Sequence, residues 1–267
     1  MECVAQMKIF LSSLEVRSER KDPGVTDLVH QMIKDGIKMK WNLMSYYYIQ
    51  NKIPLAEFIR DNSELIIIDS GAHSFQFGKK VNWVEYTKQY AEFIKRFDRP
   101  NVVGYFEMDI ENIIGYDKVK ELRKILESVS NKIIPVWHPN RGIDDFTEMC
   151  KKYSGKVVAI GGFRNTDIKD SQYLMFLKVA RKYNCKVHCL GMTRTNVLDK
   201  VPFDFTDSSS WSANSRFGNI GHGKFKKGHV SKEFSKTNTA QVFIENYKIG
   251  IAMQEHYHNK WRKECKD

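Results

Sequence analysis

The chain alternates short runs of apolar and β-branched residues with segments of helical periodicity, and this alternation limits its fold more than any other feature. Repeated strand and helix units of this kind are typical of a parallel sheet whose strands are connected by helices. Several of the helical segments begin with Asp, Ser, Thr or Asn, whose side chains favour helix starts. Eight strands are expected, at residues 7–13, 40–47, 65–70, 101–109, 132–138, 157–162, 186–192 and 203–208.

Eight strands with seven helical segments between them predict an α/β protein with a (β/α)8 barrel. The length of 267 residues fits one such barrel, which typically has about 250 residues, so we expect a single domain. A doubly wound open sheet is the alternative, but it usually has fewer strands and often a Gly-rich first turn, which this chain lacks. We expect the barrel at about residues 7–211. An irregular basic segment or small hairpin and a C-terminal helix over residues 239–263 should follow, within residues 212–267.

The charge balance points to a polyanionic partner. The chain has 43 Lys and Arg against 32 Asp and Glu, a formal net charge of +11. Such a field favours nucleic acid as partner, and a solvated basic surface is the alternative. There is no apolar run of the roughly 20 residues that a bilayer span needs, and the N-terminal residues do not resemble a secretory signal. We therefore expect a cytoplasmic protein with no membrane partner.

The cysteines predict neither disulfides nor a metal site. Their number, five, is odd, and a chain of this size does not need disulfides, which favours reduced thiols. Cys185, His188 and Cys189 lie close together, but no second Cys/His pair stands at finger-like spacing. We interpret these three as buried strand residues, and we expect no metal and no cofactor.

Polar residues fall at the ends of several predicted strands. The carboxyl ends of barrel strands meet at one mouth, so Asp69, Asp109 and Asp207 should face a common cavity. Clustered carboxylates raise one another's pKa values, which is typical of catalytic sites. Each aspartate taken singly has an alternative role, in an Asx turn or a helix cap. Further residues at such ends are Trp137, His138, Gly161 and Gly162.

The order of these motifs resembles the tRNA-guanine transglycosylase superfamily. DSG ends the third predicted strand, MD the fourth and AIGG the sixth, and GMT-x-x-N-V-L-D-K-V-P-F-D-F-T-D leads into the eighth. The resemblance covers roughly residues 60–220. Members of this superfamily are (β/α)8 barrels that exchange a guanine base for a 7-deazaguanine. The resemblance therefore implies that a 7-deazaguanine base is a small-molecule substrate and that DNA or tRNA is the partner.

The resemblance also implies roles for individual residues. Asp207 matches the family's nucleophile, and Asp69 matches the general acid and base. Asp109 matches the aspartate that hydrogen-bonds the guanine edge. Trp137 and His138 stand where the family has a glutamine for base recognition. The implied substrate-binding residues are Asp109, Ser70, Gly71, Trp137, His138, Gly161 and Gly162.

Three departures from the family pattern bear on the substrate. The family's Cys-x-Cys-x-x-Cys and His zinc site has no counterpart, because Cys265 is the only cysteine after Asp207. The loop after Asp69 has additional residues around His73, and Trp137-His138 replaces the glutamine. Compact members without the zinc subdomain resemble the phage and bacterial enzymes that place 7-deazaguanines in DNA. We therefore favour DNA over tRNA.

The expected chemistry suits these residue types. Breaking a C1′–N9 bond builds positive charge on the sugar, which a carboxylate stabilises before bonding to C1′. A second group then alternates between acid and base. A duplex base reaches such a site only when extruded, and it would stack on aromatic rings, for which the candidates are Phe75, Phe106, Trp137, Phe163 and Trp211. Candidate contacts to the nucleic-acid backbone are Arg194, Arg216, Lys224, Lys226 and Lys227.

Two functions of other classes stay open from the sequence. One is a non-catalytic nucleic-acid-binding subunit that works beside an active partner, although the presence of all three aspartates argues against it. The other is a barrel hydrolase that cuts sugars or nucleosides with the same two carboxylates. A homodimer or an accessory protein is likewise left open.

Overall fold

The computed structural model describes residues 6–15, 28–75, 81–161, 168–215, 217–221, 223–231, 234 and 238–263. Its main sheet contains nine strands, and every pairing within that sheet is parallel. The strands are β1 Lys8–Ser12, β2 Met39–Ser45, β3 Ser63–Asp69, β4 Val102–Phe106, β5 Ile133–Ile134, β6 Val136–Trp137, β7 Val157–Ile160, β8 Lys186–Cys189 and β9 Phe205–Ser208.

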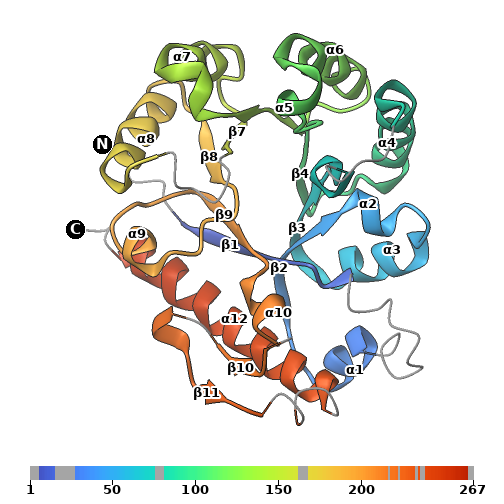
Figure 1. Ribbon diagram of the computed structural model, residues 1–267, viewed down its shortest axis with the longest axis vertical. Coiled ribbons are helices and arrows are strands. Elements are labelled where there is room, and N and C mark those ends of the chain that lie inside the picture. The colour runs from blue at the N-terminus through green and yellow to red at the C-terminus, as the bar shows by residue number, and fades with distance from the viewer. Residues whose placement is uncertain are drawn as a thin grey trace.

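The sheet closes into a barrel. Its strand order is β5-β4-β3-β2-β1-β9-β8-β7-β6, so β5 and β6 are its two ends, yet only Pro135 separates them along the chain. Proline has no N–H to donate, which interrupts the ladder within what is physically one strand. The carbonyl of Pro135 still accepts from the backbone N–H of Ala159 at 2.9 Å. The expected (β/α)8 barrel, with eight strands once β5 and β6 are joined, is therefore confirmed (Figure 1).

Helices surround the barrel on its outer side (Figure 1). They are α1 Leu28–Lys34, α2 Tyr46–Ile49, α3 Ile53–Asp61, α4 Trp83–Phe97, α5 Glu111–Ile114, α6 Tyr116–Glu127, α7 Gly142–Lys152, α8 Tyr173–Lys182, α9 Thr195–Leu198, α10 Ser210–Ser215 and α12 Thr239–Lys263. Short 3-10 turns occupy Ala72–Phe75, Pro139–Arg141, Asp170–Gln172 and Gly223–Phe225. Among the described helices, none combines the length and the apolar composition that a membrane crossing needs.

Strand alternation separates two kinds of core. Successive side chains on a strand point to opposite faces, so every second residue enters the barrel. One buried cluster fills the barrel interior, and larger clusters lie between the strands and the helices. The interior cluster consists of Phe10, Trp41, Leu43, Ile67, Phe106, Ile134, Val136, Ala159 and Phe205. The middle of the barrel is therefore a packed apolar core and not an open channel.

The last quarter of the chain completes the helical ring. A two-stranded antiparallel hairpin, β10 Asn219–Ile220 and β11 Gly228–His229, precedes α12, so the expected hairpin and C-terminal helix are both present. Within α12, the Gln254 amide donates to the carbonyls of Ile9 and Trp41 at 2.7 and 2.8 Å. The Tyr247 hydroxyl donates to Asn42 at 2.8 Å. Helix α12 therefore packs directly on β1 and β2 (Figure 1).

The predicted strands differ from the observed ones mainly at their ends. The expected strand 101–109 stops at Phe106, and Glu107 to Asp109 belong to the following loop. The expected strand 40–47 ends at Ser45, where α2 begins. The earlier end of β4 places Asp109 in the loop above the sheet, whereas Asp69 and Asp207 remain within β3 and β9.

Candidate active site

The predicted site residues share a position in the strand pattern. Three of them lie two residues beyond a member of the apolar barrel interior, and alternation therefore directs them to the same side of the sheet. The pairs are Ile67 with Asp69, Val136 with His138, and Phe205 with Asp207. Because all strands are parallel, these residues meet at the carboxyl end of the barrel, where active sites of such barrels lie.

Three hydrogen-bond donors surround Asp207. The backbone N–H of Gly191 donates to Oδ1 at 2.8 Å, and Nε2 of His188 lies 3.0 Å from the same oxygen. The hydroxyl of Ser12 donates to Oδ2 at 3.3 Å. The Asp207 side chain is 15% exposed, so the carboxylate is held from below while part of it faces the mouth.

Asp69 has an environment that disfavours its charge. Burial, followed by the negative charge of Asp109, raises its pKa from 3.8 to about 7. The hydrogen bond from the Gly71 N–H acts in the opposite direction and lowers this pKa. Asp207 adds a smaller rise, which requires Asp69 and Asp207 to lie within electrostatic range of each other. A carboxyl group with a raised pKa, Asp69, therefore shares this mouth with the hydrogen-bonded carboxylate of Asp207.

The turn after Asp69 depends on glycine. The Gly71 N–H donates to Oδ2 of Asp69 at 3.1 Å, and Gly71 has a φ of +72°. A Cβ at this position would lie 2.4 Å from Cβ of Tyr47, so a side chain is sterically excluded. Ser70 is fully buried, and its carbonyl accepts from the Tyr86 hydroxyl at 2.8 Å. The structure therefore places Ser70 behind the turn, away from the mouth where the sequence analysis expected it.

Asp109 and His138 form a pair at the mouth. Nε2 of His138 lies 2.6 Å from Oδ1 of Asp109, and the two side chains are 22% and 25% exposed. Burial lowers the pKa of His138, but the hydrogen bond and charge of Asp109 outweigh it, so that pKa lies above its ordinary value. A Cβ on Gly161 would lie 2.6 Å from Cε1 of His138. Gly161 therefore seats the imidazole of His138, which differs from the expected role of a backbone lining for a base.

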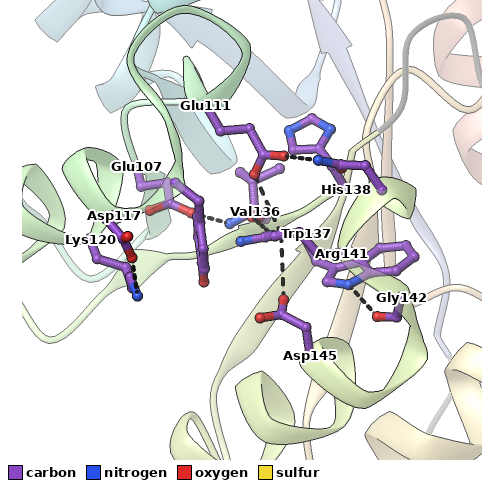
Figure 2. Close-up of polar contacts among 12 residues, drawn as sticks. Glu107, Glu111, Asp117, Lys120, Val136, Trp137, His138, Arg141, Gly142 and Asp145 are labelled. Carbon is purple, nitrogen blue, oxygen red and sulfur yellow. Dashed lines mark hydrogen bonds and ion pairs between the residues drawn. The ribbon is translucent and has the colours of Figure 1, made fainter.

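A second layer of charge supports this pair. Nε of Arg141 lies 3.4 Å from both Glu111 and Asp145 (Figure 2). The guanidinium also lies 3.7 Å from the centre of the Tyr116 ring. The side chains of Arg141 and Glu111 are only 9% and 11% exposed, so this cluster is partly desolvated. It fixes the loop that carries His138.

Trp137 does not face the mouth, and the expectation that it does was wrong. Its side chain is buried between the barrel and the outer helices, where its ring packs against Phe146 and Phe176. Its indole N–H donates to the Gly142 carbonyl at 2.9 Å (Figure 2). The physical reason is alternation, which turns Trp137 outward wherever Val136 points inward. Gly162 lies outside the described residues.

The candidate stacking aromatics are mostly core residues. Phe106 and Trp211 are 1% and 3% exposed. Phe75 packs edge-on against Tyr47 and Tyr86. Phe163 lies outside the described residues. Among the described members of this set, only Phe75 retains partial exposure beside the Asp69 turn.

The predicted nucleic-acid contacts carry less free charge than the composition indicates. Three of them pair with acids: Arg194 with Asp170 at 2.7 Å, Lys224 with Asp199 at 2.6 Å and Lys227 with Glu245 at 3.2 Å. Lys226 is exposed and has no ion pair within the described part of the chain. Arg216 lies outside the described residues. These surface pairs are weak, so a polyanion can still compete for the three cations.

Sequence reasoning missed the residues that hold Asp207. His188 and Cys189 lie buried in β8, which agrees with their interpretation as strand residues, but His188 also contacts the predicted nucleophile. The available signal was alternation, because His188 lies two residues before Leu190 at the rim of the barrel interior. In the described part of the chain, no group of three or more His, Cys, Asp or Glu side chains is arranged to hold a metal ion.

Fold and site together define a (β/α)8 barrel with a cluster of carboxylates at the carboxyl ends of its strands. No protein family matches the sequence, and no curated protein is significantly similar to it. Among solved structures, an orotidine 5′-phosphate decarboxylase from Thermotoga maritima is 12% identical, with a TM-score of 0.41. The match covers 75% of this chain and 88% of that one.

Proposed function

We propose that this protein is a guanine transglycosylase that exchanges guanine for a 7-deazaguanine in nucleic acid, with DNA favoured over tRNA. The observation that carries the proposal is the unequal pair of carboxylates at one mouth. Asp207 accepts from as many as three donors, whereas Asp69 has a pKa raised to about 7. Such a pair supplies a nucleophile together with a group that exchanges protons near neutral pH.

The proposed reaction has two halves. In the first, a carboxylate oxygen of Asp207 bonds to C1′ as the C1′–N9 bond breaks, and Asp69 transfers its proton to the departing guanine. In the second, Asp69 takes the N9 proton of the incoming 7-deazaguanine, whose N9 bonds to C1′ and releases the Asp207 carboxylate. Protons and bonds balance over the cycle, and both aspartates return to their starting state.

The pair of Asp109 and His138 supports base recognition in this proposal. Both side chains are partly exposed at the mouth, and Asp109 lies close enough to Asp69 for its charge to raise the pKa of Asp69. An oxygen of Asp109 that is not used by His138 would accept from the N–H groups of a guanine edge. Which 7-deazaguanine is favoured then depends on which substituents of the base fit beside the imidazole of His138.

Labelled guanine, incubated with the protein and either DNA or tRNA, tests the proposal by incorporation of label into the polymer. Wild-type protein should incorporate label, and Asp207→Asn should abolish it. Asp61→Asn is the matched control. Asp61 is exposed at the last residue of α3, just before β3 begins, and this start of β3 lies at the end of the barrel opposite the mouth. Absence of incorporation into both polymers by folded wild-type protein would refute the proposal.

A hydrolase acting on nucleosides is the second candidate. The ion pairs of Arg194, Lys224 and Lys227 favour it, since they reduce the free positive charge available to a nucleic-acid backbone. Release of free base from nucleosides, without any polymer and without incorporation of label, would select it. Salt-dependent binding of nucleic acid with neither activity would instead indicate a non-catalytic subunit.

A further inference from the structure

The imidazole of His188 sits in the barrel interior directly beneath the proposed nucleophile. Its side chain is 0% exposed, and Nε2 lies 3.0 Å from Oδ1 of Asp207. Three phenylalanines surround the ring: Phe106 lies edge-on at 4.9 Å between centroids, and Phe10 and Phe205 lie at 6.3 and 6.4 Å. Nδ1 has no hydrogen-bond partner among the described residues. Among the described residues, the ring therefore has a single hydrogen-bonding partner, Asp207.

The surroundings fix the tautomer of His188. Oδ1 of Asp207 already accepts from the Gly191 N–H, so it is an acceptor and Nε2 must be the donor toward it. A proton on Nδ1 would point among apolar rings, where the described residues offer it no acceptor. A proton on Nε2 instead satisfies the contact with Asp207.

These contacts make the two oxygens of Asp207 unequal. Oδ1 takes the donors of Gly191 and His188, at 2.8 and 3.0 Å. Among the described contacts, Oδ2 takes only the Ser12 hydroxyl, at a longer 3.3 Å. We infer that His188 is a positioning residue that clamps Oδ1 and so presents Oδ2 of Asp207 as the atom that bonds to C1′. The inference rests on the proposed function and adds to it the reacting atom and the residue that aims it.

Two substitutions of His188 separate positioning from packing. His188→Leu keeps a buried side chain in the apolar pocket but removes the donor, and kcat for base exchange should fall about 10- to 100-fold with KM for the base unchanged. His188→Gln places an amide N–H near the position of Nε2, so it should recover most of that loss. His30→Leu is the control, because His30 stacks on Phe58 outside the barrel. Equal losses in the Leu and Gln variants, or unchanged kcat in His188→Leu, would overturn the inference.

The tautomer gives a readout on wild-type protein that does not depend on activity, and His188→Gln serves only to assign the signal. Long-range 1H–15N spectra of wild-type protein labelled at histidine should contain one neutral ring protonated on Nε2 with a bare Nδ1, absent from His188→Gln. A proton on Nδ1 of that ring would overturn the inference. Wild-type protein that exchanges no base overturns the proposed function, whereas an active wild type with an unaffected His188→Leu variant overturns only the role of His188.

Discussion

Asp69→Asn should stabilise the protein at neutral pH, and the gain should depend on pH in a defined way. The folded-state pKa of Asp69 is about 7 against an ordinary value of 3.8, a difference of about 3 pH units. Each unit corresponds to about 1.4 kcal/mol, so ionising Asp69 in the folded protein costs up to about 4 kcal/mol. Asparagine has no such charge, and its carbonyl oxygen can still accept from the Gly71 N–H.

The sign follows from proton binding. Between about pH 4 and 7 the folded state holds a proton on Asp69 that the unfolded state has released, so the wild-type free energy of unfolding falls as pH rises. The stabilising contribution is complete below about pH 4 and lost by about pH 7. The advantage of Asp69→Asn over wild type should therefore be small at pH 4.5, grow by about 1.4 kcal/mol per pH unit, and level off above about pH 7.

Urea denaturation followed by tryptophan fluorescence, at intervals from pH 4.5 to 8, measures this difference. Other titrating groups are present in both proteins, so most of their contributions cancel in the comparison. A difference that stays constant with pH, or that shrinks as pH rises, would refute the argument that Asp69 holds its proton in the folded state.

Three further outcomes are expected. Asp109→Asn removes a negative charge beside Asp69, so the pKa of Asp69 should fall. In urea denaturation at the same series of pH values, the loss of stability caused by ionisation of Asp69 should then level off at a lower pH. Gly161→Ala places a Cβ 2.6 Å from His138 and should cost about 1–3 kcal/mol in urea denaturation together with a lower kcat. Gly228→Ala meets nothing within 4 Å and should change stability by less than about 0.5 kcal/mol; equal losses would contradict the steric argument. Arg123→Met leaves Glu107, which is 1% exposed, without the guanidinium that contacts both its oxygens, and should cost about 3–5 kcal/mol; a loss under about 1 kcal/mol would contradict it.

Local sequence pattern was enough to predict the barrel and the approximate positions of its strands. Alternation with period 2 and helical periodicity are properties of neighbouring residues, so they identify each strand before any long-range contact is known. Parallel strands bring their carboxyl ends to one mouth, and this rule alone placed Asp69 and Asp207 at the same end of the fold. Alternation also places His188 on the side of its strand that faces the barrel interior. It does not identify Asp207 as the residue that His188 contacts.

Only the tertiary structure decided what each of these side chains contacts. Asp207 and His188 lie on different strands, and the direction of Trp137 depends on where β6 joins the sheet after Pro135. The raised pKa of Asp69 requires burial and two aspartates that are distant along the chain. The ion pairs of the basic segment likewise join residues about 18 to 25 positions apart. The sequence determined that Asp69 and Asp207 reach the mouth, whereas closure of the barrel determined their neighbours, because hydrogen bonds and electrostatic fields act through space and not along the chain.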